Sequence, residues 1–231
     1  MDIVRIRNLK KYFGSGEHRV KALDGLSLSI EKGRFTVIVG ASGSGKTTLL
    51  NTIGGLYRPT AGEILVDGVN LAELSEDQLT VFRRRRVGFV FQDYRLIPEL
   101  TVRENILFPL ALDDARVDEV FFGKLAGCLG LGGKLDAFPY RLSGGEQQCA
   151  AIARALITRP AIVLADEPTG SLDVKTGQNV MGLLKMTVEV FHQTLLVITH
   201  DLELAQMAES VVRLRDGKTE VQKCDLCVPG V

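Results

Sequence analysis

Short apolar runs recur along the chain and are separated by longer segments with helical periodicity. Four runs are apolar at almost every position: residues 35–39, 87–91, 161–165 and 194–199. A run that is apolar on both faces is typical of a strand in the middle of a buried parallel sheet. The pattern therefore predicts an α/β fold in which helices cover a mainly parallel sheet.

Helices are predicted where capping residues precede helix-forming segments. Ser75 and Thr101 each open a capping-box pattern, with Gln78 and Glu104 three residues later, which marks the start of a helix. From Thr101 to about residue 129 the pattern is mainly helical, with a turn near Asp113. The other predicted helices cover residues 48–53, Ser143 to Pro160, residues 174–191 and residues 201–208.

Both ends of the chain are predicted to form strands. Residues 2–10 alternate between apolar and polar, a loop is expected over residues 10–17, and residues 22–30 contain a second alternating run. Near the other end, residues 210–214 and 218–221 flank a turn at Asp216 and Gly217, which predicts a closing hairpin.

The composition is that of an ordinary globular protein. The 231 residues are 45% hydrophobic and 24% charged, and the formal net charge is zero, so no global field favours nucleic acid or anionic lipid. We expect no nucleic-acid partner, and no direct insertion into a membrane because no apolar run approaches the roughly 20 residues that a membrane helix needs. The first residues alternate like a strand and lack the apolar segment of a signal peptide, which predicts a protein that stays inside the cell.

The four cysteines, Cys128, Cys149, Cys224 and Cys227, do not have the pattern of a disulfide framework. Cys224 and Cys227 have C-x-x-C spacing, but no second ligand pair accompanies them. An incidental position in a tail is favoured over a zinc or redox site.

The stretch after the first buried run carries the strongest chemical signal. Residues 40–47 fit G-x-x-x-x-G-K-[ST] between a predicted strand and a predicted helix, the setting in which this P-loop motif binds nucleotide phosphates. Glycines let backbone N–H groups turn toward phosphate oxygens, while the lysine reaches the β- and γ-phosphates and the threonine hydroxyl binds Mg²⁺. The predicted phosphate-binding residues are Gly40, Ala41, Ser42, Gly43, Ser44, Gly45, Lys46, Thr47 and Thr48.

Two acidic residues follow the buried run 161–165. Asp166 ends that strand and is placed to hold Mg²⁺, directly or through water. Glu167 would lie beside the γ-phosphate, where it can polarise an attacking water as a general base. The sequence thus predicts binding of a nucleotide and Mg²⁺, and a P-loop alone leaves kinases, GTPases, motors and transport ATPases open.

The segment 142–147 favours one of these classes of P-loop protein. Its sequence, Leu-Ser-Gly-Gly-Glu-Gln, resembles the signature of ATP-binding cassette (ABC) proteins, and the resemblance extends over essentially the whole chain. It implies an ATPase with a single cassette domain over residues 1–231. That domain would have a P-loop NTPase core, an N-terminal antiparallel β subdomain and an inserted α-helical signature subdomain over about residues 93–158.

The resemblance assigns further residues to the site. Tyr12 is similar to the aromatic residue that stacks on adenine, and Gln92 to the Q-loop glutamine, with a catalytic and metal-binding role. Asp173 lies in a segment similar to the D-loop, and His200 resembles the switch histidine that hydrogen-bonds the γ-phosphate. In this family two cassettes pair head to tail, so that the signature of one copy caps ATP held by the P-loop of the other. The signature residues are Ser143, Gly144, Gly145 and Glu146.

Closer similarity indicates one branch of the family. Residues 14–17, 54–56 and 83–92 are similar to those of the ATPases of lipoprotein-releasing and macrolide-exporting systems and of the cell-division cassette. This implies a homodimer that drives transmembrane permease subunits in export or mechanotransmission, from a peripheral position on the cytoplasmic face of the inner (plasma) membrane. Cys149 stands where arginine is usual in this branch, and Ser171 where asparagine is common.

Two other functions stay open. A regulatory cell-division-type ATPase bound to a membrane partner is poorly separated from an exporter by sequence. A soluble ABC protein acting on nucleic acid is less favoured, because the about fifty residues between Gln92 and Ser143 are too few for a coiled-coil arm. The run Arg83–Arg86 is interpreted as a solvated helix end, since a single basic run in a neutral chain rarely marks a nucleic-acid site.

Overall fold

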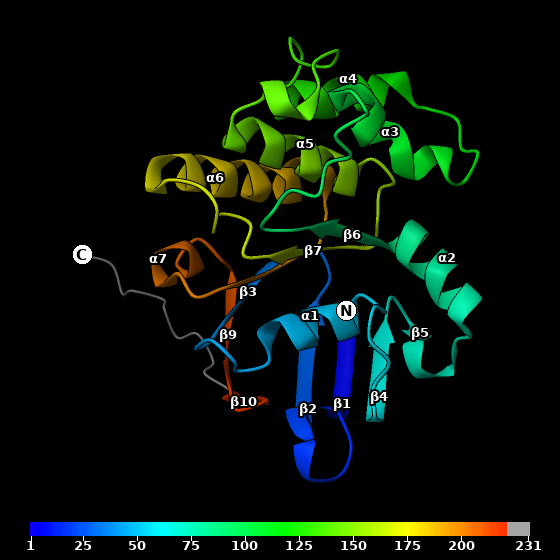
Figure 1. Cartoon of the computed structure of the whole chain (residues 1–231), viewed down its shortest axis with the longest axis vertical. Coiled ribbons are helices and arrows are strands. Elements are labelled where there is room, and N and C mark those ends of the chain that lie inside the picture. The colour runs from blue at the N-terminus through cyan, green and yellow to red at the C-terminus, as the bar shows by residue number, and fades with distance from the viewer. Residues whose placement is uncertain (221–231) are drawn as a thin grey trace.

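The computed structural model describes residues 1–220 and contains two β-sheets with helices on either side of the larger one (Figure 1). The strands are β1 (Asp2–Phe13), β2 (Val20–Glu31), β3 (Phe35–Val39), β4 (Ala61–Val66), β5 (Val69–Asn70), β6 (Val87–Val90), β7 (Ile162–Asp166), β8 (Leu195–Thr199), β9 (Ser210–Arg215) and β10 (Lys218–Glu220). The α-helices are α1 (Lys46–Ile53), α2 (Glu76–Arg86), α3 (Val102–Ala111), α4 (Glu119–Cys128), α5 (Gly144–Leu156), α6 (Val174–Phe191) and α7 (Leu202–Ala205). Single 3-10 turns lie at Gly16–His18, Leu71–Glu73 and Pro139–Arg141.

The larger sheet has the strand order β10-β9-β3-β8-β7-β6, and only its β9–β10 pair is antiparallel. Successive residues of its central strands serve opposite sides: Val37 and Val163 face the helices α3–α6, whereas Ile38 and Leu164 face the smaller sheet. Burial on both faces explains why these strands show no apolar–polar alternation. The predicted α/β fold with a mainly parallel sheet is confirmed.

The smaller sheet is antiparallel, with the order β2-β1-β4-β5, as expected for the N-terminal part. The loop predicted over residues 10–17 is wrong in its first half, because β1 continues to Phe13. Pairing of Lys10 with Asp24 and of Phe13 with Val20 satisfies the backbone there, and this long-range ladder outweighs the local polar composition. The β9–β10 hairpin forms as predicted; Val221, Cys224 and Cys227 lie outside the described residues.

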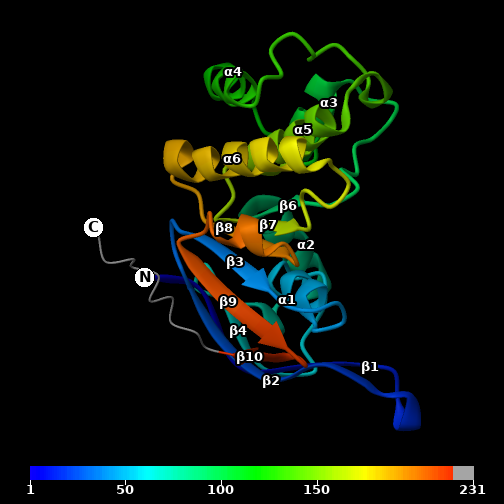
Figure 2. The ribbon, with the colours of Figure 1, turned by 90° about the vertical axis from the view of Figure 1, so that its left-hand side faces the viewer.

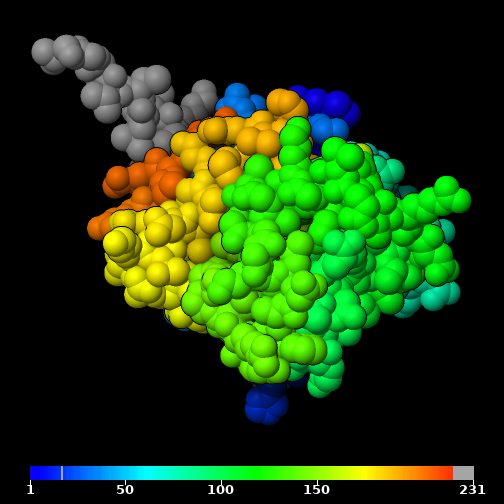
Figure 3. Space-filling model, turned by 90° about the horizontal axis from the view of Figure 1, so that it is seen from above, coloured from blue at the N-terminus to red at the C-terminus, as the bar shows by residue number. Residues whose placement is uncertain are grey.

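Capping boxes begin the helices α2, α3 and α5, at Ser75, Thr101 and Ser143. The helical pattern from Thr101 onward divides into α3 and α4, with the predicted turn near Asp113 between them. Two predicted helices end early: α5 at Leu156 and α7 at Ala205. The segments between β6 and β7, drawn in green, cover most of the upper face (Figure 3). Their treatment as an inserted subdomain over residues 93–158 stays a prediction.

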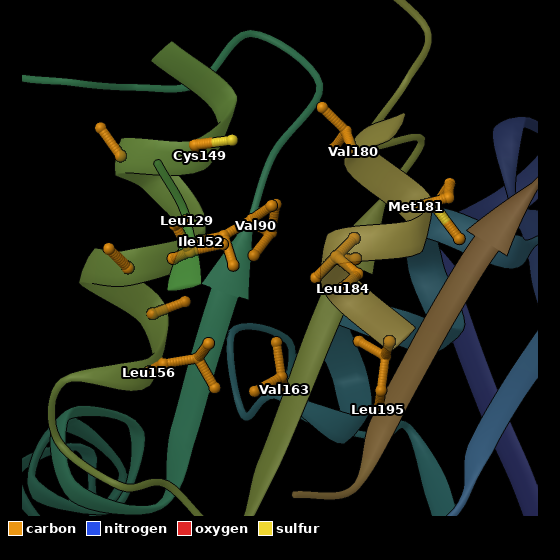
Figure 4. Close-up of a cluster of buried hydrophobic side chains, with 14 of the residues drawn as sticks. Val90, Leu129, Cys149, Ile152, Leu156, Val163, Val180, Met181, Leu184 and Leu195 are labelled. Carbon is orange, nitrogen blue, oxygen red and sulfur yellow. The ribbon is translucent and has the colours of Figure 1, made fainter. Parts of the chain in front are cut away.

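Two buried clusters hold the layers together. One lies between the two sheets and includes the apolar side chains of α1, and the other lies between the larger sheet and the helices α3–α6. Figure 2 shows these layers from the side. Cys149 on α5 belongs to the second cluster, together with side chains of β6, β7 and α6 (Figure 4). Burial, and secondarily the charge of Glu146, raises the pKa of its thiol to about 11. Cys149 is therefore an apolar packing residue.

The run Arg83–Arg86 does more than end α2 in solvent. Arg84 and Arg85 both pair with Asp113 in the turn after α3, and Arg86 pairs with Asp67 at 2.9 Å. Hydrogen bonding to Arg85 lowers the pKa of Asp113. The solvated interpretation holds only in part, because Arg84 and Arg85 link the end of α2 to the turn after α3. None of the helices over residues 1–220 has the length and apolar character needed to cross a membrane.

Candidate nucleotide site

Four predicted site segments meet at one edge of the larger sheet. The strands β3, β6, β7 and β8 run parallel, so their carboxyl ends lie together. The P-loop follows β3, Gln92 follows β6, Asp166 ends β7 and His200 follows β8. In open parallel sheets, ligands bind outside the carboxyl ends of the strands. The topology thus gathers residues that are far apart in the sequence.

The P-loop lines a cleft of about 600 Å³ together with residues 20–22, Glu167 and His200. Helix α1 begins after Gly45, which has a φ of 99°, and no side chain caps this end. The N–H groups of its first turn are therefore available to an anion, and no acidic residue lies in that turn to repel one. A Cβ atom on Gly45 would lie 2.5 Å from the Ala22 carbonyl oxygen, so this position requires glycine.

Lys46 is the buried cationic residue of this cleft. Its side chain is buried, and its ammonium donates to the carbonyl oxygens of Gly40 at 2.7 Å and Ala41 at 3.0 Å. Phosphate oxygens are stronger, charge-assisted acceptors than these neutral carbonyls. The uncapped helix and the buried lysine together fit a nucleotide triphosphate.

Thr47 and Asp166 form the pair predicted to hold Mg²⁺. The Thr47 hydroxyl donates to the Asp166 carboxylate at 3.5 Å. Burial, and then the neighbouring Glu167 carboxylate, raise the pKa of Asp166. A cation at this point would favour the ionised form, and a hydroxyl with a carboxylate is an oxygen donor set that suits Mg²⁺ alongside phosphate oxygens. The residues present therefore fit the predicted metal.

Glu167 is fixed from both its backbone and its side chain. It adopts a left-handed φ of 45°, and its N–H donates to the Ile198 carbonyl oxygen at 3.0 Å. Its Oε2 accepts from the Thr199 hydroxyl at 3.1 Å, and its Oε1 lies 3.0 Å from Nδ1 of His200. The Glu167 side chain is 19% exposed and that of His200 is 74% exposed. A largely buried carboxylate thus lies beneath an accessible imidazole at the mouth of the cleft.

Gln92 lies next to this cleft and not in it. It is exposed and lines a separate hollow of about 320 Å³ with Asp166, Arg95 and Ser171. Its amide approaches Gly170, where a Cβ atom would lie 2.8 Å from Nε2. Asp166 is therefore the residue that connects the predicted glutamine ligand to the P-loop.

The signature residues lie apart from the P-loop cleft and are not among its lining residues. Ser143 caps α5, accepting from the Glu146 N–H at 3.3 Å, while the Glu146 carboxylate accepts from Ser143 N–H at 2.8 Å and pairs with Lys134 at 3.3 Å. Gly144 lies against Tyr94 and Leu172. Glu146 thus has a structural role that the sequence-based assignment to nucleotide binding did not include.

Two other predicted nucleotide residues also have local partners. The Asp173 carboxylate accepts from the Thr176 N–H at 3.1 Å and so caps α6. Hydrogen bonding to the Thr176 side chain, and then to its N–H, lowers the pKa of Asp173. The Tyr12 hydroxyl donates to Asp24, and the guanidinium of Arg19 lies 4.1 Å from the centre of the Tyr12 ring. An adenine base can therefore stack on the face of the Tyr12 ring opposite Arg19. To stack on the face that Arg19 covers, the base must displace Arg19.

Comparison with known proteins agrees with this geometry. A family model described as ABC transporter matches residues 23–170. The ABC transporter ATP-binding protein YvcR of Bacillus subtilis is 44% identical over 222 residues, covering 94% of this chain and 86% of YvcR. The chain belongs to the ABC transporter family. It is an ABC ATPase, the ATP-binding subunit of a transporter related to the MacB export systems.

Two further relatives define the type of this ABC ATPase. The macrolide export ATP-binding/permease protein MacB of Neisseria meningitidis serogroup B is 44% identical over 220 residues, which cover 94% of this chain but 34% of MacB. The chain thus spans about a third of the MacB proteins and most of YvcR. The cassette MJ0796 of Methanocaldococcus jannaschii, solved as a dimer bound to ADP and Pi, superposes with a TM-score of 0.83 at 42% identity, covering 94% of this chain and 97% of MJ0796.

Sequence reasoning did not find three residues that shape the site of this ABC ATPase. Thr199 holds Glu167, as described above. Gln148 is fully buried on α5, and its amide donates to the carbonyl oxygens of Pro168 at 2.7 Å and Phe91 at 3.3 Å. Arg154, also on α5, donates to the Tyr94 and Arg95 carbonyls. The sequence signal for Gln148 is a polar residue on the apolar face of α5, because a polar side chain that is buried there needs hydrogen-bond partners.

Asp166→Asn is expected to separate stability from function. A raised pKa means that the folded state binds this proton more tightly than the unfolded chain, so stability is lost as pH rises through the folded pKa. The asparagine amide is uncharged and avoids the cost of burying an ionised carboxylate, so we expect a higher melting temperature than wild type at pH 7.5. Because the amide lacks the charge that would hold Mg²⁺, we expect ATP hydrolysis to be at least about tenfold slower. The melting difference should shrink as pH falls and wild-type Asp166 is protonated. A difference of the same size at acidic pH would show that the charge is not its cause.

Proposed function

We propose that this ABC ATPase drives membrane permease subunits of an export or mechanotransmission complex, through ATP binding and hydrolysis between two copies of the chain. The observation that carries the proposal is the Glu167–His200 pair at the mouth of the P-loop cleft. A carboxylate at this point is suited to accept a proton from a water beside the terminal phosphate, a function that a binding module does not need.

Each residue has a defined part in the proposed reaction. The first turn of α1 and Lys46 hold the phosphates, and Thr47 and Asp166, with Gln92 beside them, would hold Mg²⁺, which when bound neutralises phosphate charge. Glu167 accepts the proton of a water whose oxygen bonds to the γ-phosphorus as the bond to ADP breaks. His200, the more exposed side chain of the pair, turns to donate to a γ-phosphate oxygen. ADP and inorganic phosphate are the products.

Pairing of two copies is supported by what the single chain lacks. Its signature residues do not line its own cleft, whereas a head-to-tail partner would bring Ser143 and Gly145 to the γ-phosphate. Val174 and Leu202, beside the D-loop and the switch histidine, are 76% and 60% exposed and are suited to burial against a second copy. MJ0796, which is similar over its whole length, forms a dimer in its ADP and Pi complex.

The membrane partner is supported by the relatives. MacB is an export ATP-binding/permease protein, and this chain matches about a third of it, which supports a permease as the membrane partner. We place the ATPase on the cytoplasmic face of the membrane, where ATP is available. A regulatory ATPase bound to a membrane protein remains the alternative. A nucleic-acid role gains no support from the arginine run, because Arg84, Arg85 and Arg86 are ion-paired.

Reconstitution with its membrane partner tests this function. The chain should co-purify from membranes with an integral membrane protein, and that protein in lipid should stimulate ATP hydrolysis several-fold. Glu167→Gln complexes provide the control for hydrolysis by contaminants. Stimulation by a nucleic acid or ribosomes, with no effect of a membrane protein, would contradict the proposal.

A further inference from the structure

We propose that Thr199 is a positioning residue for ATP hydrolysis. Its hydroxyl would hold the Glu167 carboxylate in the orientation in which Glu167 activates the attacking water. This inference rests on the proposed function of Glu167 as general base. It assigns a specific task to a side chain that does not itself contact the nucleotide.

The contacts of Thr199 determine the direction of its hydroxyl proton. Its Oγ1 accepts the Asp201 N–H at 3.0 Å, and it lies 3.1 Å from Oε2 of Glu167. Because an ionised carboxylate only accepts, the hydroxyl must donate to Glu167. With 1% of its surface exposed, Thr199 has little access to water that could replace this bond.

Residues at the end of β8 therefore hold Glu167 in place. Three consecutive residues contact it: the Ile198 carbonyl holds its N–H, the Thr199 hydroxyl holds Oε2, and the His200 ring holds Oε1. Glu167 needs this support because its φ of 45° is a left-handed conformation that is unfavourable for a non-glycine residue. Of the two side-chain contacts, only that of Thr199 is buried, since His200 is 74% exposed.

The two side chains that contact Glu167, those of His200 and Thr199, therefore have different roles. His200 is accessible and free to turn toward a γ-phosphate, whereas Thr199 keeps one carboxylate oxygen in place throughout. Without the hydroxyl, the Glu167 side chain can rotate about its terminal bonds. A misplacement of the order of 1 Å is enough to slow a reaction about a hundredfold.

The test compares Thr199→Val with Thr199→Ser in the full chain. Valine preserves the shape and removes the hydroxyl, so kcat for ATP hydrolysis should fall about 10- to 100-fold while the Kd for ATP stays within about twofold. Serine retains the donor and should restore kcat to within about threefold of wild type. Equal kcat for valine and wild type, or equal losses in valine and serine, would overturn the assignment.

Thr194→Val is the matched control for general effects of removing a buried hydroxyl. Thr194 lies just before β8, is also 1% exposed, and accepts from the Gly33 N–H at 2.9 Å, at the end of the strand away from the site. Its variant should lose stability similarly, by thermal denaturation, and keep the wild-type kcat. If Thr194→Val lowers kcat as much as Thr199→Val, the effect is structural and the inference fails.

Glu167→Gln separates this inference from the proposed function. Loss of turnover in Glu167→Gln with normal turnover in Thr199→Val would refute the role of Thr199 alone. Normal turnover in Glu167→Gln would refute the general base and the inference with it.

Discussion

Glu167→Gln is expected to bind ATP with wild-type affinity and to hydrolyse it at least about a hundredfold more slowly. Glutamine keeps the size of the side chain and can still contact Thr199 and His200, but its amide cannot accept a proton from water. General base catalysis typically contributes about 10²- to 10⁴-fold. Hydrolysis measured under single-turnover conditions, together with nucleotide binding by fluorescence, gives both quantities.

The matched control is Glu203→Gln, an exposed carboxylate on α7 close to the same end of β8. It should leave both the rate and the affinity unchanged. A Glu167→Gln enzyme with more than about a tenth of wild-type turnover would contradict the assignment of the base, because losing it should cost at least about a hundredfold.

Lys46→Ala should abolish measurable nucleotide binding. Hydrogen bonds from a charged group contribute about 1.5–3 kcal/mol each, so losing two of them to phosphate corresponds to at least about a hundredfold higher Kd. The buried ammonium also donates to two carbonyls of the P-loop, so the variant has to be checked for folding by thermal denaturation. Isothermal titration with ATP and Mg²⁺ measures the binding.

If Lys46→Ala is less stable than wild type, Lys46→Gln provides a second test of the role of Lys46 in ATP binding. The glutamine amide can still donate to the carbonyl of Gly40 or Ala41, but it lacks the charge. Lys46→Gln should bind ATP as poorly as the alanine variant. Lys32→Ala, in the exposed turn before β3, is the control for removing a lysine and should bind normally. Unchanged affinity in both Lys46 variants would refute the P-loop assignment.

Local patterns in the sequence were sufficient for the central sheet and for the starts of the main helices. The continuous apolar runs predicted β3, β7 and β8 because both faces of these strands are buried, and capping residues marked α2, α3 and α5 because a cap is a local interaction. The P-loop and the acidic pair could be found for the same reason, since neighbouring residues perform their chemistry.

Features that depend on distant partners were not predictable. Residues 10–13 continue β1 because β2 lies beside them, and the arginine run is paired because the turn after α3 brings Asp113 to it. The contact of Thr199 with Glu167 joins the ends of two strands that are adjacent only in the folded sheet. No spacing in the sequence reports such contacts.

The proposed function requires that two copies of the chain together complete the ATP site. The mass of Glu167→Gln in solution, measured by size-exclusion chromatography with light scattering, tests it directly. With saturating ATP and Mg²⁺ we expect twice the chain mass, and a single-chain mass without nucleotide or when Ser143→Arg is added to the same variant. A single-chain mass for Glu167→Gln at saturating ATP and Mg²⁺ would contradict the proposed function.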